Sequence, residues 1–116
     1  MSKRGNTEYY FDECLLGAAK LLNRRGFAVL HPGHPAIPQL PYGATDPQWM
    51  TEVAKRDLIA VTRDRRINRR SSEKVIVRES GLRVIWFTGR KDMTPDDQAT
   101  LFLKHLDRIR VMTIKL

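Results

Sequence analysis

Residues 46–64 read D-P-Q-W-M-T-E-V-A-K-R-D-L-I-A-V-T-R-D, and this stretch decides the fold. Pro47 suits the first position of a helix, and apolar side chains follow it at helical spacing: Trp49, Met50, Val53 and Ala54. Residues 58–61 then form a short apolar strand, which is typical of a strand covered on both faces. Asp64 follows its carboxyl end, where parallel α/β sheets collect ligand-binding residues.

The same alternation of strands and helices continues on both sides of this stretch. Strands are predicted over residues 8–11, 27–30 and 82–87, and a proline-rich loop over residues 31–45. Helices are predicted over residues 13–25, from near Ser71 or Ser72, and from Thr94, where T-P-D-D-Q provides a cap, a proline and two acids. The pattern predicts an α/β protein with a parallel sheet of about four strands.

Length and charge limit the classes of protein. With 116 residues the chain suits one domain, which we expect over residues 8–116 after a flexible start at residues 1–7. Lys and Arg number 21 against 13 Asp and Glu, so the net charge of +8 favours a nucleic acid, a polyphosphate or an acidic protein as partner. No apolar run is long enough to span a membrane, and the polar start does not resemble a signal peptide.

Cysteine usage indicates the compartment. The single cysteine, Cys14, excludes an internal disulfide framework and a multi-cysteine zinc site, so we expect a soluble, cytoplasmic protein. We expect Cys14 itself to be a small buried hydrophobe. The two histidines of H-P-G-H, His31 and His34, lack a nearby third ligand and do not predict a zinc site.

Three carboxylates are expected at one edge of the sheet. Asp12 follows the first strand, Asp46 opens the helix that leads to the third strand, and Asp64 follows that strand. Oxygen ligands of this kind suit Mg²⁺ or Mn²⁺, which can activate water for phosphodiester hydrolysis. Glu13 is a further candidate ligand, and Thr62 is a candidate for positioning a bound water. In the alternative interpretation Asp12 and Asp46 are only helix caps and Asp64 is an ordinary turn residue.

Basic and aromatic residues add candidate RNA contacts. Arginines surround Asp64 in the sequence and suit phosphate binding: Arg63, Arg65, Arg66, Arg69 and Arg70. The alternative is a solvated charged loop. Tyr42 is the candidate for stacking on a base, with loop packing as its alternative, whereas Trp49 and Trp86 are expected in the core.

These residues resemble the PIN-domain family, specifically the compact PIN-like ribonucleases that include VapC-type toxins. The resemblance covers about residues 9–87 and rests on F-D-E at residues 11–13 and on a pattern met by Asp46, Trp49, Ala54, residues 59–61, Thr62 and Asp64. It implies a three-layer α/β/α fold and a metal-dependent endoribonuclease site with Asp12, Asp46 and Asp64 as its acids. Larger members carry another acid on a helical insertion, whereas this chain has no acid between Glu13 and Asp46.

Three functions follow as hypotheses. The first is an Mg²⁺- or Mn²⁺-dependent endoribonuclease acting on RNA, the toxin of a toxin-antitoxin pair, with a cognate antitoxin that covers the site and a homodimer as expected partners. The second is a non-catalytic PIN-like nucleic-acid-binding or adaptor domain with a degraded metal site. The third is a phosphoacceptor signalling domain, which leaves the positive charge and the residues around Asp46 unexplained.

Overall fold

The computed structural model describes residues 8–63, 71–88 and 92–109. Within them a parallel sheet contains three strands in the order β1 (Tyr9–Phe11), β2 (Ile59–Thr62) and β3 (Arg83–Trp86). β2 is the central strand, with Val61 paired to Phe11 on one side and to Ile85 on the other. The strands are parallel because a helix connects each to the next, as the sequence pattern predicted.

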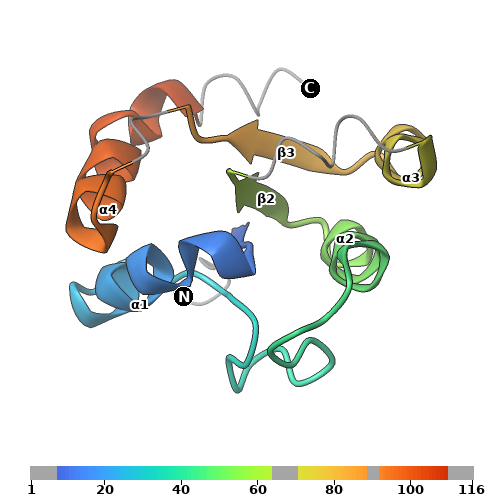
Figure 1. Cartoon of the computed structure of the whole chain (residues 1–116), viewed down its shortest axis with the longest axis horizontal. Helices are drawn as coiled ribbons and strands as arrows, with labels where there is room; N and C mark the ends of the chain where they lie inside the picture. Colours follow the sequence, from blue (N-terminus) through green and yellow to red (C-terminus); the bar gives the residue numbers. More distant parts are fainter. Residues whose placement is uncertain (1–7, 64–70, 89–91, 110–116) are drawn as a thin grey trace.

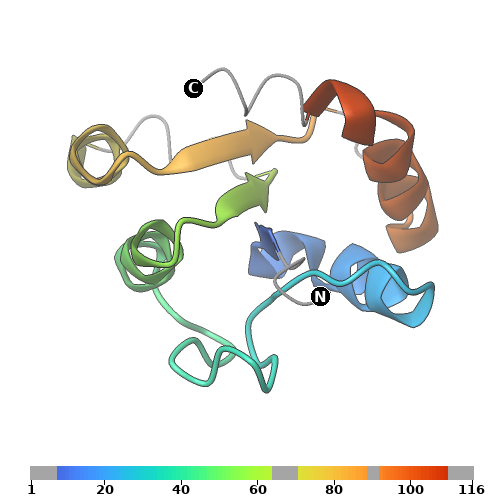
Figure 2. The same ribbon diagram turned by 180° about the vertical axis from the view of Figure 1, so that it is seen from behind.

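Helices cover both faces of this sheet (Figures 1 and 2). The short 3-10 helix η2 (Glu13–Leu15), α1 (Leu16–Arg24) and α4 (Pro95–Lys104) lie on one side, and α2 (Asp46–Lys55) and α3 (Ser71–Ser80) lie on the other. The predicted three-layer α/β/α architecture is therefore confirmed. None of the described helices is long and apolar enough to cross a membrane.

Alternate residues of the strands enter two separate cores. Tyr9, Phe11 and the odd-numbered residues of β2 pack toward α1 and α4, whereas Tyr10 and Ala60 pack toward α2 and α3. This division follows from the two-residue period of a strand. Phe102 of α4 anchors the first core, with ring centroids 5.2 Å from Tyr9 and 5.0 Å from Phe11.

The segment expected as a fourth strand joins the sheet only briefly. Within the described residues 27–30, Leu30 alone forms a parallel bridge, with Tyr10 at the outer edge of β1. Its amide donates to Tyr9 O at 2.9 Å, and its carbonyl accepts from Phe11 N at 2.9 Å. Pro32 follows two residues later and has no amide to donate, so the ladder cannot continue. In the part of the chain that the structure describes, the expected sheet of about four strands consists of three strands and this bridge.

The helix starts are set by local side chains. Thr94 caps α4 through a capping box with Asp97, as T-P-D-D-Q predicted. At α2 the cap is Thr45, not Asp46: its hydroxyl accepts from Gln48 N, and Gln48 Oε1 accepts from Thr45 N at 2.9 Å. Asp46 therefore lies in the first turn of α2, and its carboxylate takes no part in the cap. The interpretation of Asp46 as the helix cap is wrong.

Candidate functional site

The carboxyl ends of β1 and β2 define the crevice of the sheet. β1 leads into η2 and α1 on one face of the sheet, whereas the helix that follows β2, α3, lies on the other face, so the connections diverge between these neighbouring strands. Such a switch point is where open parallel α/β sheets bind their ligands. Asp12 comes directly after β1, and its amide donates to Val61 O at 2.9 Å. Thr62 ends β2 beside it.

Asp12 is a buried carboxylate held by uncharged donors. Its residue is 7% exposed. Oδ1 accepts from Glu13 N at 2.6 Å, and Oδ2 accepts from Thr62 Oγ1 at 2.9 Å and from Cys14 Sγ at 3.6 Å. The expected capping role is confirmed, since Asp12 caps η2. One carboxylate oxygen serves this cap, while the other faces the end of β2.

The electrostatic environment opposes a charge on Asp12. Burial raises the pKa of the Asp12 carboxyl above its usual value, while the hydrogen bonds from Thr62 and Glu13 lower it. The charge of Asp46 raises the same pKa further, so the two carboxylates lie within electrostatic range of each other. The structure thus brings together two of the three acids expected at this edge.

Trp49 fixes the carboxylate of Asp46. Its indole Nε1 donates to Asp46 Oδ1 at 3.0 Å, one helical turn along α2. Trp49 is 2% exposed and stacks on Tyr10 with ring centroids 5.6 Å apart. The expected core position is confirmed, but the sequence reasoning missed the positioning role. The spacing D-x-x-W on a helix is the signal that would have found it.

Thr62 and Cys14 both contact Oδ2 of Asp12. Thr62 is fully buried and donates to Asp12, so its hydroxyl orients a carboxylate. Cys14 is exposed, which corrects the expectation of a buried hydrophobe. Its sulfur is nevertheless partly buried: it lies 3.7 Å from Thr62 Oγ1 and accepts from Arg63 N at 3.4 Å. Partial burial of the sulfur raises the pKa of the Cys14 thiol, so it stays protonated near neutral pH.

The Glu13 side chain binds the proline-rich loop and has a different role from that of Asp12. Its carboxylate Oε1 accepts from Gly43 N at 2.8 Å, which ties η2 to the proline-rich loop. The other predicted site residues, apart from the half-buried Arg63, lie outside the described residues: Asp64, Arg65, Arg66, Arg69 and Arg70. In the described part of the chain, no group of three or more His, Cys, Asp or Glu side chains is arranged to hold a metal ion.

The chemistry of the two described acids nevertheless fits a hard divalent cation. Two neighbouring carboxylates repel each other, and the hydrogen-bond donors to the Asp12 carboxylate are an amide, a hydroxyl and a thiol, none of which carries a positive charge. A cation between such oxygens would favour their ionised forms. Asp12 and Asp46 are therefore the described residues able to share a metal ion, and Asp64 follows the end of β2 in the sequence.

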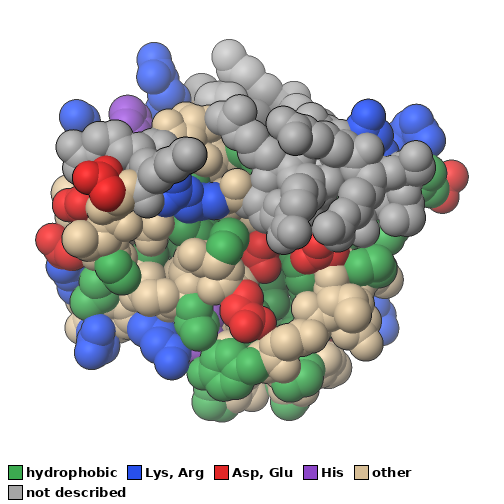
Figure 3. Space-filling model, viewed as in Figure 1, with side chains coloured by type: hydrophobic (Ala, Val, Ile, Leu, Met, Phe, Trp, Pro, Cys, Tyr) green, Lys and Arg blue, Asp and Glu red, His purple; other side chains and the backbone are tan. Residues whose placement is uncertain are grey.

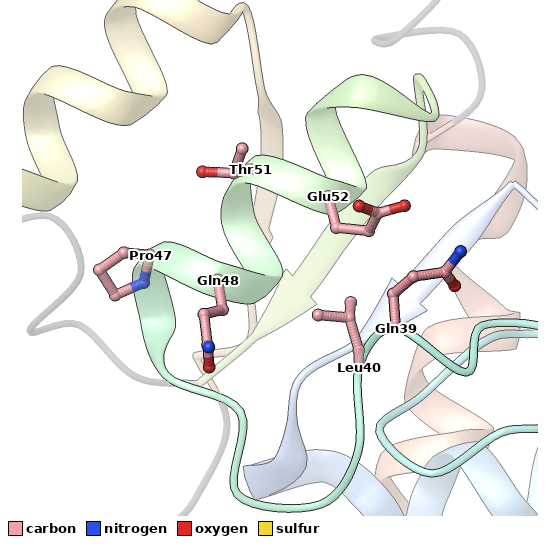
Figure 4. Close-up of a pocket in the computed structure, with 6 residues that line it drawn as sticks. All are labelled: Gln39, Leu40, Pro47, Gln48, Thr51 and Glu52. Carbon is pink, nitrogen blue, oxygen red and sulfur yellow. The ribbon is translucent and has the colours of Figure 1, made fainter.

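A separate hollow lies between the proline-rich loop and α2 (Figure 4). It has a volume of about 440 Å³ and is lined by Gln39, Leu40, Pro47, Gln48, Thr51 and Glu52. Glu52 is paired with Arg56 at 2.7 Å, and Arg56 also donates to Gln39 Oε1 at 2.8 Å. None of the predicted site acids lines this hollow, so it is not the candidate catalytic site.

Charge is unevenly spread over the molecule. Figure 3 shows Asp and Glu side chains near the centre of one face, and Lys and Arg side chains over α1 at its lower left. An acidic centre suits a metal ion, and a basic margin suits the phosphates of a nucleic acid.

The fold and the paired acids define the class of protein: an α/β domain with a carboxylate site at the switch point of its parallel sheet. The sequence matches the family described as PIN like domain over residues 7–89, so the chain belongs to this family. The expected resemblance to the PIN-like family is thereby confirmed, while the resemblance to VapC-type toxins stays a prediction. Proteins of this family are generally nucleases. α4 lies beyond the matched residues. No curated protein and no solved structure matched the chain.

Proposed function

We propose that this protein is an Mg²⁺- or Mn²⁺-dependent endoribonuclease that hydrolyses phosphodiester bonds of RNA. The observation that carries the proposal is the pair Asp12 and Asp46, two carboxylates close enough for the charge of one to raise the pKa of the other at the switch point of the sheet. Membership of a nuclease-type family supports the same chemistry. The net charge of +8 suits a polyanionic substrate.

Each residue has a distinct role in this proposal. Asp12, Asp46 and Asp64 hold the cation, with Thr62 and Trp49 orienting the first two through their hydrogen bonds. A bound divalent cation supplies Lewis acidity, which lowers the pKa of water and stabilises charge on the phosphate. The arginines between residues 63 and 70 bind the phosphates that flank the cleaved bond.

Glu13 is the weaker candidate for a further ligand. Its Oε1 already accepts from Gly43 N, so one of its oxygens serves the loop. We assign Glu13 to holding the proline-rich loop beside the site. The cation then has three carboxylate residues and completes its coordination with water, as Mg²⁺ commonly does.

The test is cleavage of a mixed panel of single-stranded and hairpin RNAs with Mn²⁺ or Mg²⁺, with and without chelator. Asp46→Asn should abolish cleavage. The matched control is Asp57→Asn, because Asp57 lies in the turn before β2 with a side chain 94% exposed and a φ of 59°, which asparagine tolerates. Full activity of Asp46→Asn, or activity in chelator, would refute the proposed mechanism.

Within this function we propose that the protein is the toxin of a type II toxin-antitoxin pair. An antitoxin would cover the acidic site by inserting an Arg or Lys side chain toward Asp12 and Asp46, and a homodimer is the proposed assembly. Expression together with the neighbouring gene should relieve growth arrest and yield a stable complex. Growth that is unaffected by the protein alone would contradict the toxin role.

A second candidate is a non-catalytic nucleic-acid-binding or adaptor domain of the same family. The engagement of Glu13 by Gly43 favours it, because this leaves the described site with two acids. The melting temperature discriminates between the candidates: a working site is stabilised by Mn²⁺ and a degraded one is not. RNA that is bound but remains intact would support the second candidate.

A further inference from the structure

A basic pocket lies between α1 and the start of the proline-rich loop, apart from the carboxylates. Its volume is about 400 Å³, and its lining consists of Lys20, Asn23, Arg24, His31 and His34, here called the α1 pocket. Four of these five residues carry or can carry positive charge. A cavity of this size has room for a phosphate group and part of a nucleotide.

The wall of the α1 pocket is fixed by hydrogen bonds. Both groups of the Asn23 amide bind the backbone of Val29: Nδ2 donates to Val29 O at 3.0 Å, and Oδ1 accepts from Val29 N at 2.7 Å. His31 is 7% exposed, and its Nδ1 donates to Pro32 O at 2.8 Å. These contacts hold the loop against α1, so the cavity is formed before any ligand arrives.

His34 presents a hydrogen-bond donor even when it is uncharged. Its Nδ1 accepts from Ala36 N at 3.0 Å, so the neutral ring carries its proton on Nε2. Burial and the charge of His31, whose ring lies 5.0 Å away, lower the pKa of His34. The neutral imidazole can thus donate to a phosphate oxygen.

The two longer cations are available for an anion. Lys20 and Arg24 lie four residues apart, which places them on the same side of α1. Both are exposed, and neither forms an ion pair with another described residue. An unpaired lysine and arginine beside a histidine pair form a site suited to a phosphate.

Tyr42 connects the α1 pocket to the acidic site. Lys20 Nζ lies 5.6 Å from the centre of the Tyr42 ring, which remains 53% exposed. The ring rests directly on Gly33: a Cβ built there would lie 2.5 Å from it, and the φ of +79° also favours glycine. Gly43, the next residue, donates to Glu13 beside Asp12. The ring is therefore both anchored and open to solvent.

We propose that the α1 pocket binds a phosphate of single-stranded RNA and that an adjacent base stacks on Tyr42. The RNA strand would run from the α1 pocket across Tyr42 toward Asp12 and Asp46. This path rests on the proposed ribonuclease function. None of the pocket residues belongs to the arginine-rich sequence between residues 63 and 70. Phosphate contacts and a stacking aromatic are the two elements of single-strand recognition without base reading.

The test is the affinity of fluorescein-labelled oligouridine for the intact protein in chelator, where cleavage does not contribute. The double variant Lys20→Gln, Arg24→Gln should flatten the plot of log K against log salt by about 1.4, since each single-strand phosphate contact contributes about 0.7. Tyr42→Leu should weaken binding about 5- to 150-fold, as expected for the loss of one stacked base. Melting curves confirm that each variant is folded.

The matched control is Lys55→Gln, which removes an exposed charge from α2 on the other side of the sheet. It should leave the salt slope unchanged. A salt slope for the double variant equal to that of Lys55→Gln would overturn the proposal. Inorganic phosphate should compete only weakly with oligouridine. If inorganic phosphate competes as well as unlabelled oligouridine does, and Tyr42→Leu has no effect, the pocket binds free phosphate and the proposal is overturned.

These experiments test the RNA-binding inference and the ribonuclease function separately. RNA binding that depends on the α1 pocket, in a protein that never cleaves, would leave this inference standing and refute the ribonuclease function. Metal-dependent cleavage by a protein whose α1 pocket variants bind RNA normally would refute this inference alone.

Discussion

The hydrogen bond from Trp49 to Asp46 provides a direct test of the metal site. Trp49→Phe keeps an aromatic ring against Tyr10 but removes the Nε1 donor that lies 3.0 Å from Asp46 Oδ1. We expect metal binding to weaken, because Asp46 then loses the contact that orients it. The substitution leaves every proposed ligand in place, so the effect reports positioning alone.

The magnitude follows from that single bond. A hydrogen bond to a charged group is worth about 1.5–3 kcal/mol, and removing a contact that orients a metal ligand typically weakens metal affinity about 10- to 100-fold. With the cation at about one hundred times its Kd, binding stabilises the wild type by about 2.7 kcal/mol. A tenfold weaker site leaves about 1.4 kcal/mol, a difference of roughly 5–10 °C in Tm for a domain of about this size.

The assay is the rise in Tm caused by a fixed concentration of Mn²⁺, measured for each variant against its own metal-free protein. This difference removes the packing loss that Trp49→Phe causes by itself. Trp86→Phe is the matched control, because Trp86 Nε1 is buried and has no hydrogen-bond partner among the described residues. An unchanged Mn²⁺-induced rise in Trp49→Phe would refute the positioning role, as would an equal loss in Trp86→Phe.

Three further predictions concern stability. The pKa of Asp12 in the folded protein lies above its usual value of 3.8. The protonated carboxyl therefore stabilises the folded state at low pH, and this stabilisation is lost as pH rises through the pKa of the folded protein. The urea midpoint of Asp12→Asn should therefore rise relative to that of the metal-free wild type as pH increases from acid to neutral. A difference between the two midpoints that does not change with pH would contradict this. Thr45→Ala should cost about 1 kcal/mol by removing the α2 cap, against almost none for the exposed Thr51→Ala, as measured by urea unfolding. Phe102→Ala should cost about 3–5 kcal/mol in the same measurement, and a loss below about 1 kcal/mol would show that the first core does not depend on this ring.

Much of the fold is readable in the local pattern of residues. The apolar residues of 58–61 predicted a strand buried on both faces, and β2 is fully buried at the centre of the sheet. T-P-D-D-Q predicted the start of α4, and Thr94 caps it. These features were predictable because strand burial and helix capping depend on neighbours a few residues apart.

Other features lay beyond local reasoning. Thr45 caps α2 in place of Asp46, although both residue types suit a cap, because the reciprocal contact with Gln48 selects the threonine. Residues 27–30 have the composition of a strand but contribute only the bridge at Leu30. How far a segment pairs depends on where the neighbouring strand and the following loop carry it.

The sequence by itself determined the α/β class, the separation of the strands into two cores and the placement of Asp12 at a strand end. Only the tertiary structure decided which polar atoms meet across the sheet: Thr62 and Asp12 are fifty residues apart in the chain, yet their side chains lie 2.9 Å apart. It likewise brought Lys20 over Tyr42 and placed the histidines of H-P-G-H beside α1. Periodicity fixes the face on which a side chain lies, whereas its partner depends on strand register and helix packing, which are set by the whole core.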